Sequence, residues 1–229
     1  MLRFYRELCP TLPDEAEAYL GVLTDPNAGM PVVAMVLGYN GDLAEGERVL
    51  APVRTFGNPL VDLVGPVPYG VRQVMLDEPN AVHGLNRYWR SAFVDAISDD
   101  LIAAIVDQAS RFSSPLSALL FFYLHGAATR VPVDATAFSA RRPIWDFDAI
   151  GQWAELTESD VHTSWVRTAW DEFAPHLGDG AGYINHLSGD ERPEQVRASY
   201  GSNLARLRQL KTTYDPENTF RMNPNISPG

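Results

Sequence analysis

Two acidic residues separated by a single position, Asp146 and Asp148, form the first pattern in this sequence that could do chemistry. Residues 144–153 alternate between apolar and polar side chains, which is typical of a β-strand with two different faces. The alternation puts Asp146, Asp148 and Gln152 on one face, where neighbouring carboxylates would raise each other's pKa and could act as acid or base. A solvated polar face without chemistry is the alternative, because acidic side chains are usually exposed.

A tyrosine and an asparagine, Tyr183 and Asn185, form a second such pattern. Residues 182–187 predict a short strand, on which side chains two positions apart share a face. A tyrosine can remove a proton from a substrate only if its surroundings lower its pKa from about 10. On its own, such a pair on a strand is more often structural, so both interpretations stay open.

Other familiar catalytic patterns are absent from the sequence. There is no G-x-S-x-G turn, Walker loop, H-E-x-x-H or paired C-x-x-C, which argues against the common hydrolases, nucleoside triphosphatases and zinc enzymes. The single cysteine, Cys9, cannot form an internal disulfide and is interpreted as a half-buried structural residue. The histidines lack metal-ligand spacing, so no metal site is predicted. They are His83, His125, His162, His176 and His186.

Helices and strands must position these residues. Along the chain, the spacing of apolar residues alternates between the period typical of helices and the period typical of strands. Their mixture predicts an α+β fold, in which helices pack on a sheet. Ser98 is a plausible N-cap of one helix, and Thr157 opens another in the form of a capping box. Helices are predicted at 42–56, 98–112, 157–173 and 203–213, and strands at 19–24, 30–39, 85–93, 116–125, 144–153 and 182–187. On the last helix Leu210 is expected to face inward, and Phe220 is expected to pack the tail onto the body.

The negative charge of the chain argues against two classes of binding partner. Its 18 basic and 29 acidic residues give a formal charge of −11, which would repel nucleic acids and anionic membranes. The longest apolar run, 116–124, is too short for a membrane span, and the N-terminus lacks the apolar segment of a signal peptide. We therefore expect a cytoplasmic protein that acts on a small molecule, with no nucleic acid or membrane as partner.

The C-terminal part of the chain carries an ordered series of motifs. They are Tyr183-x-Asn185, Tyr200-Gly201-x-Asn203, Arg206-Leu207, Lys211, Tyr214-Asp215-Pro216-x-Asn218-x-Phe220-Arg221 and Asn223-Pro-Asn225-Ile226-x-Pro228, preceded by Pro68-Tyr69, Tyr88-Trp89, Gly126-Ala127, Thr136-Ala137-Phe138-x-x-Arg141 and Trp153. The series resembles the C-terminal region of berberine-bridge-enzyme-like FAD-linked oxidases, in the vanillyl-alcohol-oxidase superfamily. The resemblance spans nearly all of residues 1–229, and 183–229 is its signature segment.

The resemblance implies a substrate-binding domain with a large, mainly antiparallel sheet, from an enzyme whose FAD-binding domain is missing here. It implies that Tyr183 is a catalytic residue near the reactive face of the flavin and that Asn185 binds the cofactor. Asp148 and Gln152 become candidates for substrate contact, because their strand corresponds to one that lines the family's substrate pocket. No glycine-rich phosphate loop is present, so we expect this chain not to retain FAD by itself.

Two hypotheses of function follow. In the first, the chain is the substrate-binding part of a truncated or split FAD-dependent oxidoreductase, which passes a hydride from an organic substrate to flavin. It is then inactive alone, and a separate FAD-binding polypeptide is a possible partner. In the second, it is a flavin-free small-molecule-binding module or a cofactor-independent enzyme on the same scaffold. An exposed apolar patch on the flavin-facing edge would favour the first hypothesis and a polar edge the second.

Overall fold

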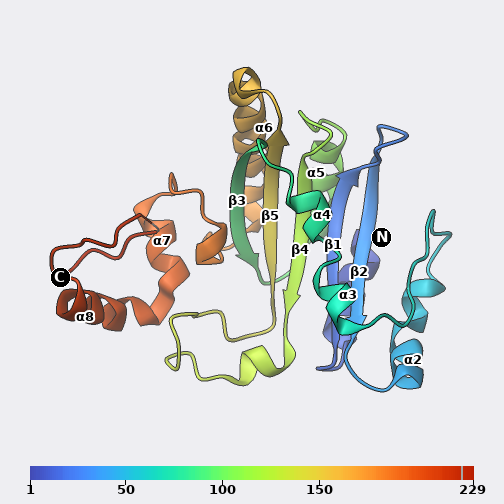
Figure 1. Cartoon of the computed structure of the whole chain (residues 1–229), viewed down its shortest axis with the longest axis horizontal. Helices are drawn as coiled ribbons and strands as arrows, with labels where there is room; N and C mark the ends of the chain where they lie inside the picture. Colours follow the sequence, from blue (N-terminus) through green and yellow to red (C-terminus); the bar gives the residue numbers. More distant parts are fainter. Residues whose placement is uncertain (223) are drawn as a thin grey trace.

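Five strands form one antiparallel sheet in the order β2-β1-β4-β5-β3 (Figure 1). The computed structural model describes residues 1–222 and 224–229. The strands are β1 (Ala16–Thr24), β2 (Pro31–Tyr39), β3 (Asn86–Val94), β4 (Ala118–Leu124) and β5 (Ile144–Trp153). The prediction of an α+β fold with a mainly antiparallel sheet is confirmed, and five of the six predicted strands are present.

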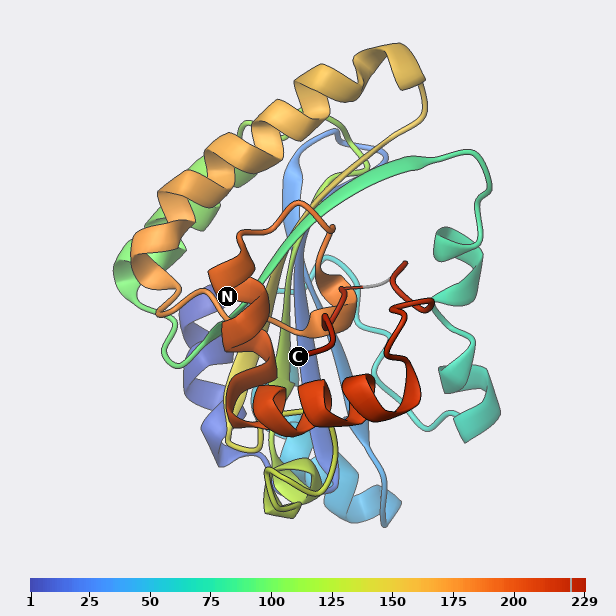
Figure 2. The ribbon, with the colours of Figure 1, turned by 90° about the vertical axis from the view of Figure 1, so that its left-hand side faces the viewer.

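Helices line the sheet unevenly. In the edge-on view of Figure 2, α1 (Leu2–Leu8), α5 (Asp99–Ala109) and α6 (Ser159–Phe173) lie on one side of the sheet. The short helices α3 (Tyr69–Gln73) and α4 (Asp77–Asn80) lie on the other side. The remaining helices are α2 (Leu43–Arg54), α7 (Pro193–Tyr200) and α8 (Leu204–Tyr214), of which α7 and α8 lie beyond the β3 edge in Figure 1. No described helix has the length and apolarity to cross a bilayer.

The pleat of β5 separates an apolar face from a polar one. Phe147 points toward the helices, where its ring stacks on Phe121 of β4 at 4.5 Å and meets Trp170 and Phe173 of α6. Its neighbours in the chain, Asp146 and Asp148, point to the opposite face because side chains alternate along a strand. The core therefore lies between the sheet and α1, α5 and α6, and the predicted acidic face lies outside it.

Of the two predicted helix N-caps, the structure confirms one and contradicts the other. Ser98 accepts a hydrogen bond from the amide of Leu101 at 3.0 Å, which confirms it as the cap of α5. The capping box at Thr157 is wrong, because the chain first makes a 3₁₀ turn over Leu156–Glu158 and α6 begins at Ser159. The Ser159 hydroxyl donates to the Leu156 carbonyl at 2.7 Å, which closes that turn.

The strand predicted at 182–187 is also wrong. The amide of Phe93 donates to the Ala181 carbonyl at 2.6 Å, so the chain touches the edge of β3 there. At Gly182, a Cβ atom would lie only 2.7 Å from the Ser91 carbonyl oxygen, so glycine permits this close approach. The chain then turns into a 3₁₀ segment, η5 (Ile184–His186), and does not continue along the sheet.

The C-terminal tail is held by an aspartate and not by the predicted aromatic anchor. The Asp215 carboxylate accepts from the amides of Thr219 and Phe220, while Lys211 Nζ donates to the Phe220 carbonyl at 2.6 Å. The Phe220 side chain is 81% exposed, so the expectation that it packs on the body is wrong. Leu210, expected to face inward on α8, is exposed as well.

Phe147→Ala should reduce the free energy of unfolding by about 3–5 kcal/mol, because it removes a fully buried aromatic ring from between two sheet strands and a helix. The matched control is Phe220→Ala, which removes the same group from an exposed position and should change stability by about 0.5 kcal/mol or less. Urea unfolding followed by circular dichroism measures both. Equal losses in the two variants would contradict this description of the core.

Candidate functional site

The polar face of β5 and the turn at η5 meet on the side of the sheet opposite the main helices. Asp146 lies beside Phe122 of β4 in the register, and Asp148 lies between Leu120 of β4 and Ser91 of β3. The Ser91 hydroxyl donates to Asp146 Oδ1 at 3.0 Å. The two carboxylates are thus fixed on a rigid strand rather than on a loop.

The turn brings Tyr183 and Asn185 together although it is not a strand. The amide of His186 donates to the Tyr183 carbonyl at 2.8 Å, which closes the turn. Asn185 Nδ2 then donates to Tyr183 Oη at 2.7 Å. Tyr183 is half-buried, and its ring meets Phe138 edge-on at 5.8 Å, whereas Asn185 is exposed. The expected side-by-side placement is present, but a local hydrogen bond produces it in place of strand alternation.

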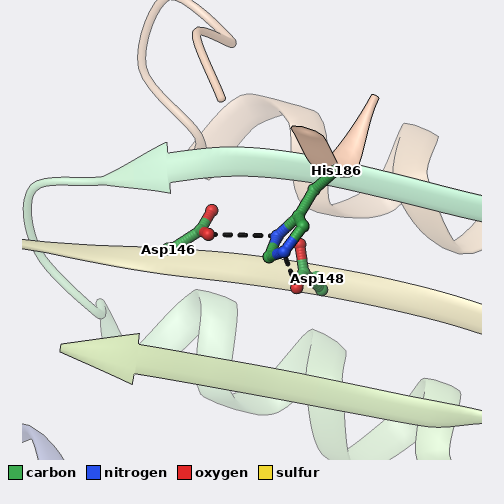
Figure 3. A group of neighbouring side chains, drawn as sticks. All are labelled: Asp146, Asp148 and His186. Atoms are coloured by element: carbon green, nitrogen blue, oxygen red, sulfur yellow. Dashed lines mark ion pairs between the residues drawn. The ribbon is translucent and has the colours of Figure 1, made fainter. Parts of the chain in front are cut away.

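His186 joins the turn to the acidic face of β5. Its Nδ1 atom lies 3.2 Å from Asp146 Oδ2 and 3.1 Å from Asp148 Oδ2 (Figure 3). The ring is enclosed by Tyr183, Trp89 and Phe122, with centroids at 4.9, 5.4 and 6.3 Å. We call Asp146, Asp148 and His186 the carboxylate–histidine cluster.

Burial and charge act in opposite directions within this cluster. Burial lowers the pKa of His186, but the two carboxylates raise it more, to about 10. Burial also raises the pKa of Asp148, an effect that the neighbouring imidazole only partly offsets. The Asp148 side chain has no exposed surface, whereas 24% of the His186 side chain is exposed. Any molecule that approaches from solvent meets the imidazole before it meets this carboxylate.

A second set of contacts holds the turn against the sheet. Arg90 of β3 binds both oxygens of Asp190, at 2.6 and 3.1 Å, and the Tyr88 hydroxyl donates to the same carboxylate at 2.7 Å. The buried carboxylate of Glu191 accepts from the amides of Ser188 and Gly189 at 2.6 and 2.7 Å. We call residues 188–191 with Arg90 and Tyr88 the latch. It fixes the chain two residues after His186 and thereby fixes the cluster.

Gln152 lies apart from the other predicted site residues. It is four positions beyond Asp148 on β5, which corresponds to about 13 Å along a strand. Its side-chain oxygen accepts from Arg87 Nε of β3. The structure therefore brings Tyr183, Asn185 and Asp148 into one region and places Gln152 near the end of the sheet.

His186 is a residue of the site that was not predicted from the sequence. It is separated from Asp148 by 186 − 148 = 38 positions, and ligand-spacing patterns apply to neighbours on one turn or strand. The one local signal is its position directly after Asn185. Cys9 has the structural role expected of it, because it is buried and burial raises the pKa of its thiol to about 11.

The latch should make stability depend on acid pH. Burial raises the pKa of Asp190, but Arg90, Tyr88 and Arg167 lower it more, to about 2. The unfolded value is about 3.9, so the stabilisation is complete above that pH and is lost as the pH falls toward 2. Asp190→Asn should reduce the free energy of unfolding at pH 7 by about 1 kcal/mol or less, because the pair is partly exposed.

Urea unfolding of wild type and Asp190→Asn at a series of pH values from 7 to 3 measures the effect. The difference between the two proteins should shrink below pH 4. The control is Asp171→Asn on α6, an exposed carboxylate that contacts no cation in the described part of the chain. A difference that stays constant with pH would show that the Asp190 carboxylate does not stabilise the latch.

Known proteins are similar to this chain in sequence and in fold. The family described as "Berberine and berberine like" matches residues 182–227, which include η5 and residues 188–191 of the latch. An FAD-linked oxidoreductase of Dictyostelium discoideum is 32% identical over 213 residues, covering 86% of this chain and 42% of that protein. An uncharacterized FAD-linked oxidoreductase of Bacillus subtilis is 25% identical and matches the whole chain and 51% of its own length. The chain thus spans about half the length of the curated relatives it matches, or less.

Solved structures share the fold. 6-Hydroxy-D-nicotine oxidase from Arthrobacter nicotinovorans superposes with a TM-score of 0.80 at 23% identity, over 97% of this chain and 50% of its own. The H104A variant of berberine bridge enzyme superposes with a TM-score of 0.77 at 16% identity, over 100% of this chain and 52% of its own. In sequence, the chain is therefore similar to FAD-linked oxidoreductases over about half of their length or less, and its residues 182–227 match the berberine and berberine-like family.

Proposed function

We propose that this chain forms the substrate-facing part of an FAD-linked oxidoreductase and that its open sheet face, with the turn at η5, borders the flavin. FAD would supply hydride acceptance when bound. The observation that carries the proposal is the Tyr183–Asn185 pair, joined by a 2.7 Å hydrogen bond within the segment that matches the family. The flavin itself would be held by an FAD-binding domain, either elsewhere in a longer protein or on a separate polypeptide.

The residues of the turn suit a flavin and a small substrate. Asn185 is exposed, and its Nδ2 donates to Tyr183. Among the described residues its side-chain oxygen and its second N–H have no partner, so they can bind a polar ring edge. The bond also fixes the position of Tyr183 Oη. We assign Tyr183 to proton removal from the substrate and Asn185 to cofactor binding.

Asp148 takes a supporting role in this proposal. It was expected to contact substrate, but its carboxylate lies wholly buried behind His186. His186 is therefore the better candidate for direct contact, with Asp148 and Asp146 holding its ring in place. Gln152 lies near the sheet end with Arg87, where it could contact only the distal part of an extended substrate.

Large apolar side chains are exposed in two separate segments of the chain. Leu60 and Leu63, between α2 and α3, are 84% and 87% exposed, and Phe220 and Met222, after α8, are 81% and 95% exposed. Contiguous exposed apolar surface marks interaction sites, so a partner domain that covered either segment would favour the first hypothesis over a flavin-free module. The FAD-binding half of the family is the partner that we propose for them.

The purified chain should be colourless. A dinucleotide needs a cradle of backbone N–H groups at a strand-to-helix turn, and the sequence holds no glycine-rich loop of that kind. An absorbance spectrum after gel filtration in the presence of added FAD tests this. Stoichiometric flavin that survives filtration would contradict the proposed division of roles, because this chain would then bind the cofactor by itself.

Tyr183→Phe should lower the rate of flavin reduction by roughly 10² in a complex of this chain with a matching FAD-binding domain, the usual effect of removing one proton-transfer group. The ring is retained, so the melting temperature should change little. The matched control is Tyr214→Phe, which removes a hydroxyl from a side chain that is 80% exposed. An unchanged rate with a lowered melting temperature would make Tyr183 a structural residue.

A further inference from the structure

We propose that Tyr19 and Phe122 determine substrate specificity and that they select a flat, apolar substrate body of two fused aromatic rings. The inference rests on the proposed function, because it names the class of substrate that binds the same open sheet face. It gives a role to β1 and β4, whereas the residues of the proposed function come from β5 and the turn at η5. We call Tyr19 and Phe122 the aromatic floor.

The register of the sheet places the aromatic floor beside the carboxylate–histidine cluster. Tyr19 of β1 lies opposite Phe122 of β4, and Phe122 lies opposite Asp146 of β5. Directly opposed residues on adjacent strands share a face, so these three side chains form one row on the open face. The rings of Tyr19 and Phe122 meet edge-on with centroids 5.1 Å apart, and the Phe122 ring lies 6.3 Å from the His186 ring. A molecule bound at His186 can therefore extend over Phe122 to Tyr19.

Tyr19 is held in place at the outer end of this row. Its hydroxyl donates to Glu17 Oε2 at 2.8 Å, and Glu17 forms an ion pair with Arg72 of α3. The guanidinium of Arg72 occupies the space that a Cβ atom at Gly38 would need, so the glycine lets the arginine reach the sheet. A hydrogen bond and an ion pair thus fix the ring, which is the support that a specificity-determining side chain requires.

The surroundings of the aromatic floor are apolar. Two rows of opposed residues cross β2, β1 and β4 on this face. They are Val36–Tyr19–Phe122 and Ala34–Gly21–Leu120. The one polar side-chain group in these rows is the Tyr19 hydroxyl, which Glu17 already binds. A carbohydrate on this surface would leave its hydroxyl groups without partners, which is costly, whereas a flat aromatic body gains ring and aliphatic contacts.

The outer end of the row offers no net charge to a substrate. Glu17 and Arg72 neutralise each other. Burial, and then the neighbouring Glu17, raise the pKa of Tyr19 to about 12, so its phenol stays neutral at physiological pH. These groups favour a substrate body without charge.

The length of the row determines the size of the substrate. Adjacent strands lie ~4.8 Å apart, so the row spans ~10 Å from β5 to β1. A single six-membered ring seated beside His186 covers Phe122 but ends before Tyr19. A second fused ring is needed to contact Tyr19, and this contact distinguishes bicyclic from monocyclic substrates.

Ligand-observed NMR titrations of the purified chain test the inference without flavin. The probes are 2-naphthalenemethanol, which has two fused rings, and benzyl alcohol, which has one. Wild type should bind the naphthyl probe roughly tenfold more tightly, because the second ring is buried against Tyr19. Tyr19→Ala should abolish this preference and leave the affinity for benzyl alcohol unchanged.

Tyr19→Phe is the conservative variant, which keeps the ring and loses the hydrogen bond to Glu17. The preference for the naphthyl probe should survive in it. Tyr214→Ala is the matched control, since it removes the same group from a side chain that is 80% exposed on α8 and should change neither affinity. Melting temperatures show whether each variant folds, and Tyr19→Leu, which keeps apolar volume in the sheet, replaces Tyr19→Ala if that variant does not.

Three results would overturn the inference. They are equal affinity of wild type for the two probes, a preference that a folded Tyr19→Ala or Tyr19→Leu variant keeps in full, and a preference that Tyr19→Phe loses. Each of them leaves the oxidoreductase proposal standing, because the effect of Tyr183→Phe on flavin reduction tests that proposal. An unchanged reduction rate in Tyr183→Phe would in turn leave the binding preference of the isolated chain as it is.

Discussion

The alternation of side chains along β5 is the constraint on which the rest of the structure depends. One strand has to place Phe147 in the core between β4 and α6 and, in adjacent positions, Asp146 and Asp148 on the other face. A shift of one residue in register would exchange the two sets and bury both acids among aromatic rings. The packing that stabilises the sheet therefore also orients the candidate site.

The latch holds the second part of the site, the turn at η5, against the sheet. β3 contributes Arg90 and Tyr88, which bind Asp190 and thereby hold the chain that carries Tyr183, Asn185 and His186. The site thus combines a rigid strand with a turn that has little regular structure of its own. Rigid support of this kind is what precise positioning of a few side chains requires.

Most of the sheet could be predicted from the sequence because its signals are local. Residues 144–153 alternate so clearly that the predicted and observed ends of β5 coincide. The prediction of a strand at 182–187 was wrong because six alternating residues are too few to identify a strand. The same pattern also fits an extended segment that touches the edge of β3 and then turns. The prediction for the C-terminal tail was wrong for another reason. Backbone hydrogen bonds to the Asp215 carboxylate hold the tail, and packing of the Phe220 side chain does not. The pairing of His186 with two acids far earlier in the chain leaves no local signal, so only the fold could show it.

The distance in sequence between Asp148 and His186 has a consequence for the order of events during synthesis. The two acids leave the ribosome before the histidine, when β4 and β5 can already pair. Until the turn arrives, these carboxylates must stay hydrated or take up protons, so the sheet cannot close over them early. A nascent chain that stops short of the turn therefore has a complete set of strands but lacks the imidazole that pairs with the two carboxylates.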